Sequence, residues 1–226
     1  MEDNDHNQST HAIITKVELQ ARKKNRYNIY INEEYAFSLH EDMLIKHRLM
    51  KGDLIDRTLL EKVMQDEERH AAYLKGLRIL GRRPHSRLEM KQKLGQSGYD
   101  ARVCEYAIER LLEQGYLNDA MFAQQLADQR IAFNHKGRNY VRYELKAKGI
   151  SKDEIAQALE ALDDDAEFEA ALTLAQRKWN STSGTQVDKK RKTMGLLLRR
   201  GYTQSLVRRV MEHVQQTTEF DEDLFD

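Results

Sequence analysis

The stretch RNYVRYELKAKGISKDEIAQALEAL, residues 138–162, decides how this chain folds, because two other segments repeat its pattern. The related segments are RLEMKQKLGQSGYDARVCEYAIERL, residues 87–111, and RKTMGLLLRRGYTQSLVRRVMEHV, residues 191–214. In each, an apolar helix face leads to a glycine that is followed by an apolar residue, and glycine can take the left-handed conformation that ends a helix. A period of roughly 50 residues is typical of tandem structural repeats.

Matching positions in the three segments predict a first helix, a turn and a second helix. The first helices carry the apolar pairs Met90 and Leu94, Val141 and Leu145, and Met194 and Leu198. They are followed by Gly98, Gly149 and Gly201, and then by the expected N-cap residues Asp100, Ser151 and Thr203. The second helices carry Cys104, Ile108 and Leu111; Ile155, Leu159 and Leu162; and Val207, Met211 and Val214. Chance agreement among helical faces is the alternative, but it does not explain the matching glycines and caps.

One more helix precedes each pair, so each unit has three helices. The expected ranges are Glu67–Leu80, Ala120–Ala132 and Ala166–Lys178. Units this small bury little surface alone, so we expect them to stack into an elongated or curved array.

The N-terminal part of the chain has a different period. Apolar and polar residues alternate between Ile13 and Leu39, which predicts three short strands with turns at Lys23–Asn25 and Asn32–Glu34. The predicted fold is therefore mainly α, with tandem three-helix repeats after a small antiparallel β meander. The expected divisions are a mobile tail 1–11, the meander 12–56, repeats 57–117, 118–163 and 164–215, and an acidic tail 216–226.

Composition restricts the class of protein. The 37 basic and 37 acidic residues cancel, so any electrostatic site must come from local segregation of charge. A single cysteine excludes an intramolecular disulfide, the acidic start is unlike a secretory signal, and no apolar run could span a membrane. We therefore expect a cytoplasmic protein with no membrane partner. We also expect a monomer, although nothing in the composition determines the oligomeric state.

Motifs of catalysis are missing from the sequence. It contains no GxxxxGK[ST], GxSxG or HExxH, and no two of its eight histidines are spaced i, i+4. Cys104 and Trp179 are expected to pack in the core, and the run Asp163–Asp165 to cap a helix and not to bind a metal. We predict no enzyme activity, no cofactor and no metal site.

Segregated basic charge remains as the candidate binding feature. In the middle repeat Arg138, Arg142 and Lys146 are spaced i, i+4, i+8, which predicts a ridge beside the apolar stripe. Stacked repeats could align basic positions into a stripe that binds phosphates or an acidic protein surface, although a merely solvated face is the alternative. The candidate residues are Arg82, Arg83, Arg87, Lys91, Arg130, Lys136, Arg138, Arg142, Lys146, Lys148, Lys190, Arg191, Arg199 and Arg200.

These motifs resemble the RecX family of regulators of the RecA recombinase over nearly the whole chain. The resemblance rests on Gly115–Asp119, Phe122-Ala123, Lys136–Arg138 and Leu145–Ile150, with Asn118 in a position where many members carry an acidic residue. The segments around Arg26–Tyr30 and Glu34–Ser38 resemble the extra N-terminal module of part of the family.

The resemblance implies a regulator without catalytic residues. Its implied partners are RecA and the single-stranded DNA of the RecA filament, with naked DNA as a further partner. It implies inhibition of strand exchange, ATP hydrolysis and co-protease activity, and so a role in homologous recombination, DNA repair and the SOS response. The alternative is a stand-alone nucleic-acid-binding helical protein, such as a transcriptional regulator.

Overall fold

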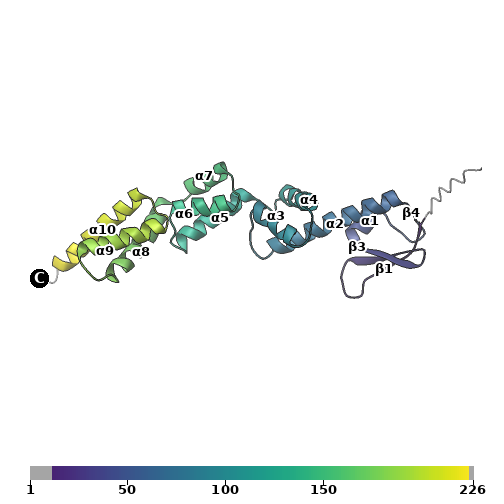
Figure 1. The fold of residues 1–226 in the computed structure, drawn as a ribbon, viewed down its shortest axis with the longest axis horizontal. Helices are drawn as coiled ribbons and strands as arrows, with labels where there is room; N and C mark the ends of the chain where they lie inside the picture. Colours follow the sequence, from purple (N-terminus) through teal and green to yellow (C-terminus); the bar gives the residue numbers. More distant parts are fainter. Residues whose placement is uncertain (1–11, 224–226) are drawn as a thin grey trace, which may run out of the picture. The chain divides into compact units, whose positions relative to one another are not determined.

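The computed structural model describes residues 12–223 and confirms a mainly helical chain preceded by an antiparallel sheet (Figure 1). The strands are β1 (Ala12–Leu19), β2 (Arg26–Ile31), β3 (Glu34–His40) and β4 (Leu54–Ile55). The helices are α1 (Glu41–Lys46), α2 (Arg57–Leu80), α3 (Arg87–Gln96), α4 (Ala101–Glu113), α5 (Asp119–Ala132), α6 (Arg138–Ala147), α7 (Lys152–Glu160), α8 (Asp164–Asn180), α9 (Gln186–Arg199) and α10 (Gln204–Asp223). These elements form two compact units. The first unit consists of residues up to 82 together with residues 91–116, and the second unit consists of residues 83–90 together with residue 117 onward.

The sheet has the strand order β3-β2-β1-β4. The three predicted strands are present, and Asn25, Asn32 and Glu33 adopt the left-handed conformation within the two predicted turns. The fourth strand was not predicted. It consists of Leu54 and Ile55, which pair with Ile13 and Ala12, and two residues are too few to show an alternating pattern.

Helix α2 is longer than the sequence suggests, because it begins at Arg57 and not at Glu67. The Asp56 side chain caps it by accepting a hydrogen bond from the Leu59 amide at 2.7 Å. In its first half Val63 is buried with the sheet residues. In its second half Gly76 lies so close to Leu111 of α4 that an added Cβ would sit 2.7 Å from Leu111 Cδ1. One helix therefore completes the core of the sheet and also packs in the first repeat.

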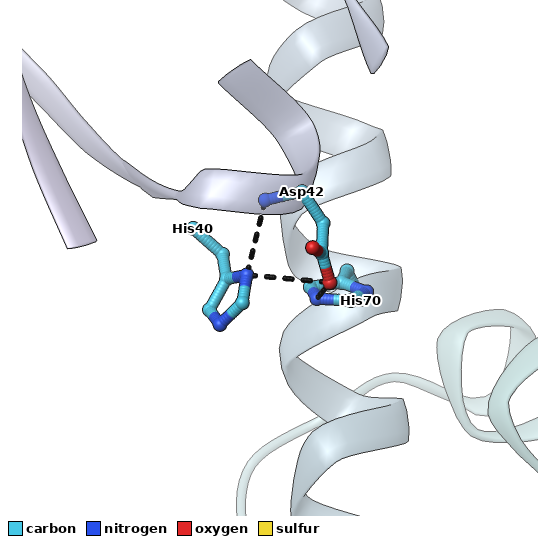
Figure 2. A group of neighbouring side chains, drawn as sticks. All are labelled: His40, Asp42 and His70. Atoms are coloured by element: carbon cyan, nitrogen blue, oxygen red, sulfur yellow. Dashed lines mark hydrogen bonds and ion pairs between the residues drawn. The ribbon is translucent and has the colours of Figure 1, made fainter. Parts of the chain in front are cut away.

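Polar contacts hold α1 to α2 at the end of β3 (Figure 2). His40 is the N-cap of α1, and its Nδ1 accepts a hydrogen bond from the Asp42 amide at 3.2 Å. His70 of α2 is buried and places its Nε2 3.0 Å from Asp42 Oδ2. Burial, together with the neighbouring His40, lowers the pKa of His70. Glu67 of α2 accepts a hydrogen bond from the His40 amide at 2.8 Å, so two residues of α2 hold the β3–α1 corner.

The repeat predicted from the sequence is confirmed in its turns. The helix-ending glycines Gly98, Gly149 and Gly201 have φ values of 93°, 78° and 89°. The predicted caps follow them, with Ser151 forming a capping box with Glu154. The side chains of Asp100 and Thr203 accept hydrogen bonds from the amides of Val103 and Leu206. The predicted apolar residues of all three second helices are buried.

The register predicted for the third repeat was wrong by one residue. Thr193 and Leu197 are fully buried, whereas Leu198 is 43% exposed. Thr193 and Leu197 stand eight and four residues before the helix-ending glycine, as Val141 and Leu145 do in the middle repeat. The glycine, and not the first arginine, sets the register because it fixes where the helix ends.

The second and third repeats join where α9 ends and α6 begins. The amides of Gly137 and Asn139 donate to the carbonyls of Arg200 and Gly201 at 2.9 and 3.0 Å, in place of a side-chain cap on α6. A Cβ on Gly137 would lie 2.3 Å from the Tyr202 backbone nitrogen, so only glycine permits this approach. The carbonyl end of one helix thus caps the amide end of another, which also aligns their dipoles favourably.

The two predicted tails have different outcomes. Residues 1–11 lie outside the described residues. The segment 216–226 was predicted as an acidic tail, and α10 continues into it as far as Asp223. Within residues 12–223, every helix is too short or too polar to cross a bilayer.

Candidate nucleic-acid and protein-binding surface

The fourteen basic residues singled out in the sequence fall into two groups by exposure. The exposed group is Arg82, Arg83, Arg87, Lys91, Arg142, Lys146, Lys190, Arg191 and Arg199. The partly buried group is Arg130, Lys136, Arg138, Lys148 and Arg200. The exposed residues can meet a partner directly, whereas the partly buried ones contact other parts of the chain.

Arg138 is a structural residue in this arrangement. Its Nε lies 2.9 Å from Glu167 Oε2, its Nη2 donates to the Leu162 carbonyl at 3.0 Å, and it also pairs with Asp164. The Arg138 amide donates to Glu167 Oε1 at 3.0 Å. Burial raises the pKa of Glu167, and Arg138 counteracts that shift. Arg138 is the first residue of the ridge predicted from the i, i+4 spacing. It forms ion pairs with α8 and is therefore not available to a partner in the way that an exposed cation is.

The outer face of α6 carries Arg142, Tyr143 and Lys146 (the α6 face). All three are exposed, and Tyr143 is 75% exposed, while Val141 and Leu145 on the opposite side of the helix are buried. Arg142 donates to Asn139 on the same helix at 2.8 Å. Tyr143 was not among the predicted site residues, although its position next to Arg142 and three residues before Lys146 places it on the same face.

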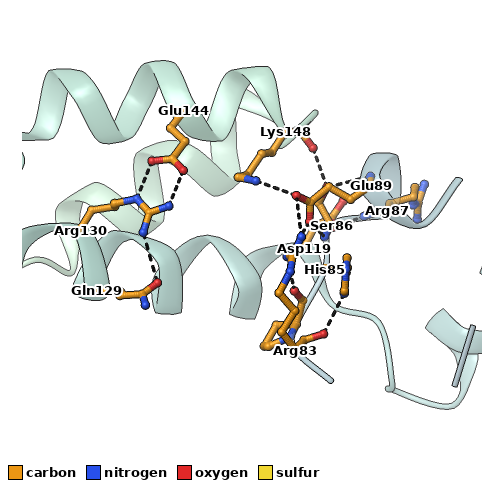
Figure 3. A network of polar contacts seen from close by, with 11 residues as sticks. Arg83, His85, Ser86, Arg87, Glu89, Asp119, Gln129, Arg130, Glu144 and Lys148 are labelled. Carbon is orange, nitrogen blue, oxygen red and sulfur yellow. Dashed lines mark hydrogen bonds and ion pairs between the residues drawn. The ribbon is translucent and has the colours of Figure 1, made fainter. Parts of the chain in front are cut away.

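A second basic feature is a cavity of about 510 Å³ in the middle repeat (the basic pocket). Its walls come from α5, from the residues before α3 and from the end of α6 (Figure 3). The lining residues are Arg83, Pro84, Phe122, Gln125, Leu126, Gln129, Arg130 and Lys148. Three of the predicted basic residues therefore meet around one hollow, which their sequence positions alone do not indicate.

Acidic residues neutralise much of the charge in this pocket. Glu144 pairs with both Arg130 Nη2 and Arg130 Nε, at 2.6 and 2.7 Å. Glu89 pairs with Lys148 at 2.6 Å and with Arg83 at 3.2 Å. Although burial acts to raise it, hydrogen bonds from Lys148 and Arg83 lower the pKa of Glu89 to about 2. Three cations against two carboxylates leave one net positive charge.

The residues before α3 are held firmly against the middle repeat. Ser86 Oγ donates to the Lys148 carbonyl at 2.8 Å, and the Arg87 amide donates to Asp119 Oδ1 at 2.8 Å. Gly149 approaches Leu88 so closely that an added Cβ would lie 2.8 Å from Leu88 Cβ. These contacts position Arg83 at the pocket.

Among the remaining predicted cations, Arg82 lies between α2 and α3, and Arg87 and Lys91 lie in α3. Lys136 follows α5, and the others lie in α9 or at its C-cap: Lys190, Arg191, Arg199 and Arg200. Arg191 pairs with Asp188 at 3.2 Å, and Arg200 donates to the Asn134 carbonyl at 3.3 Å. Lys136 lies 4.0 Å from the centre of the Tyr140 ring, a cation–π contact. When the second and third repeats are aligned on their helix-ending glycines, Met194 and Leu198 occupy the positions that Arg142 and Lys146 have in the middle repeat. The exposed basic ridge of the middle repeat is therefore not repeated in the third.

Residues set aside in the sequence analysis have structural roles. Asp163 caps α8 by accepting a hydrogen bond from the Asp165 amide at 2.9 Å. Asn118 caps α5 by accepting from the Met121 amide at 2.9 Å, so the cap is kept without an acidic residue. Cys104 and Trp179 are buried in their repeats, as predicted.

A chain of small three-helix units belongs to the class of tandem helical-repeat proteins. Four family models match it: "Regulatory protein RecX N-terminal domain" at residues 12–56, and the first, second and third three-helix domains of RecX at residues 72–111, 118–159 and 165–211. The chain belongs to the RecX family of regulatory proteins.

Individual relatives cover almost the whole chain. It is 30% identical over 213 residues to the regulatory protein RecX of Clostridioides difficile, covering 93% of this chain and 99% of that one. It is 32% identical over 209 residues to that of Bacillus thuringiensis, covering 90% and 77%. A crystal structure of regulatory protein RecX superposes with a TM-score of 0.78 at 26% identity, covering 89% and 99%. RecX from Lactobacillus salivarius shares the fold, with a TM-score of 0.63 at 21% identity over 67% of this chain and 99% of that one. RecX proteins are regulators and not enzymes, which confirms the prediction of a non-catalytic protein.

Proposed function

We propose that this protein regulates RecA by binding the RecA filament on single-stranded DNA, and that it inhibits strand exchange, ATP hydrolysis and co-protease activity. Membership of the RecX family supports the RecA partner. The observation that supports contact with DNA is the α6 face, where Arg142 and Lys146 flank the exposed Tyr143.

The α6 face has the chemistry of a sequence-neutral track for single strands. Cations pair with phosphates, and an exposed aromatic ring can stack on any base, which contributes roughly 1–3 kcal/mol per base. Because the opposite side of α6 is buried in the middle repeat, the helix presents these three side chains on a rigid support. A reader of duplex DNA would instead need base-edge contacts in a groove and would show sequence preference.

The proposal is tested by reversing the two exposed charges with Arg142→Glu and Lys146→Glu in one variant. Arg138 is left intact so that the fold is kept. Binding is titrated on naked single-stranded DNA and on RecA filaments at several salt concentrations. If both residues meet phosphates, the slope of log affinity against log salt should fall by roughly 1.4, since each lost contact on single strands removes roughly 0.7. The variant should also inhibit the RecA ATPase less.

A matched control reverses two exposed helical cations elsewhere, Lys62→Glu with Arg102→Glu. It changes the net charge equally, so it measures the long-range effect of charge alone. Weakened binding to filaments with unchanged binding to naked DNA would assign the α6 face to RecA and not to DNA. Equal affinities of the test variant, the control and the unchanged protein in both titrations would show that the α6 face is only solvated.

A further inference from the structure

The first unit contains a cluster of potential metal ligands that the binding function does not use. It consists of His40, Asp42 and His70, whose ligand atoms all lie within 4.8 Å of one another (Figure 2). His40 and His70 are thirty residues apart in the sequence, so no spacing rule for metal ligands connects them. The fold brings them together because β3 runs directly into α1, and α1 packs on α2.

The distances in the cluster suit a small divalent transition metal. Asp42 Oδ2 lies 3.0 Å from His70 Nε2 and 3.5 Å from His40 Nδ1. Ligands at roughly 2.0–2.2 Å from a tetrahedral zinc ion are separated by about 3.3–3.6 Å, so Asp42 is already near the required distance from both histidines. To share one ion, the two histidine nitrogens must approach each other from up to 4.8 Å, and His40 Nδ1 must release the hydrogen bond that it accepts from the Asp42 amide. Two imidazoles and one carboxylate are a ligand set that Zn²⁺ and its neighbours accept, with a remaining position for water.

The surroundings allow an ion to enter. A cavity of about 360 Å³ opens beside the cluster and is lined by Asp42 and His70 together with Asp66 and Tyr106. The Asp42 side chain is largely exposed and can adjust, whereas His70 is buried and fixed by its helix. A flexible carboxylate beside a fixed imidazole can close around an ion without movement of the backbone.

We propose that His40, Asp42 and His70 form a binding site for a divalent transition metal of the zinc class. The ion would connect the β3–α1 corner to α2, the helix that is shared by the sheet and the first repeat. The site lies in a different unit from the α6 face, and the proposal does not depend on the proposed function.

Arg110 of α4 gives the proposal a specific consequence. Its Nη1 lies 3.5 Å from His70 Nδ1, to which a guanidinium can donate a hydrogen bond only while Nδ1 carries no proton. Metal on Nε2 leaves the proton on Nδ1, so the guanidinium must turn away. In Arg110→Gln the amide oxygen can instead accept a hydrogen bond from Nδ1–H, the second-shell contact that metal-bound histidines prefer. The variant should therefore bind metal more tightly than the unchanged protein.

The test uses the full chain with Zn²⁺ in calorimetry and Co²⁺ in visible absorption. The unchanged protein should bind one ion at this site, and Zn²⁺ should raise its melting temperature. Asp42→Asn should weaken the affinity by more than about 10-fold, the lower range for loss of even a second-shell contact. Asp153→Asn, which removes an exposed carboxylate from the first turn of α7, is the matched control and should bind as the unchanged protein does.

Circular dichroism of each variant checks that the fold is kept. A lower affinity in Asp42→Asn together with a higher affinity in Arg110→Gln supports the site. Absence of saturable binding overturns the proposal. Binding of equal strength in the unchanged protein and in Asp42→Asn also overturns it, because the metal would then be held by other histidines.

Discussion

Replacing Arg138 by alanine should destabilise the third repeat and its junction with the second far more than an equivalent change in the exposed part of α6. In the structure the Arg138 side chain is 24% exposed and Glu167 is 6% exposed. Their ion pair is therefore neither a surface pair, which contributes roughly 0–1 kcal/mol, nor a fully buried one, whose disruption removes roughly 3–5 kcal/mol. The Leu162 carbonyl also loses a donor. We expect a loss of about 2–3 kcal/mol in the free energy of unfolding.

The assay is urea unfolding followed by fluorescence of the single tryptophan. Trp179 lies in α8, the helix that also carries Glu167, and is buried in the core of the third repeat, so its emission reports on the affected region. The matched control is Arg142→Ala on the same helix, which should change stability by no more than about 0.5 kcal/mol. Introducing Glu167→Gln beside Arg138→Ala should recover part of the loss, since a neutral amide needs no counter-charge.

The effect should depend on pH in a defined direction. Burial already raises the pKa of Glu167 above 4.5, and removal of Arg138 should raise it further. A carboxyl whose folded pKa is raised favours the folded state below its unfolded pKa, and this contribution is lost as the pH rises through the folded pKa. The loss caused by Arg138→Ala should therefore be smaller at pH 5 than at pH 7.5. Equal small losses for Arg138→Ala and Arg142→Ala, with no pH dependence, would refute the assignment of Arg138 as a structural residue.

Two further predictions concern the junctions of the second unit. Gly137→Ala should lower the free energy of unfolding by at least about 2 kcal/mol, because its Cβ would overlap the Tyr202 nitrogen, whereas Gly95→Ala on α3, with nothing within 4 Å, should be neutral or slightly stabilising; equal melting temperatures would contradict this. Since the pKa of Glu89 is lowered to about 2, its ion pair should stabilise fully above pH 4.5 and weaken as the pH falls toward 2. An acid titration of Glu89→Gln should show a shallower loss, and an unchanged profile would argue against the pairing.

Much of the fold could be predicted because its signals are local. Glycines that end helices, side chains that cap the next helix and the period of the apolar residues act within one or two turns of the chain. These signals located three repeats and a β module, and a resemblance in the same residues indicated the RecX family. In the third repeat the local pattern did not predict the correct register. Three consecutive apolar residues, Leu196–Leu198, are compatible with two registers of the helix, and in the structure Leu197 is the one that is buried.

The binding surface could be predicted less well, because the acidic residue that pairs with a given basic residue is not adjacent to it in the sequence. The sequence placed Arg138, Arg142 and Lys146 on one helix, but it could not show that Glu167, 29 residues away, holds the first of them.

The sequence by itself thus determined the repeats, their caps and the family, through interactions between near neighbours in the chain. Only the tertiary structure decided which cations face solvent, which residues surround the basic pocket, and that His40 and His70 meet at Asp42. The physical reason is that burial and ion pairing depend on contacts between elements that are distant in the chain, and these contacts exist only after the helices have packed.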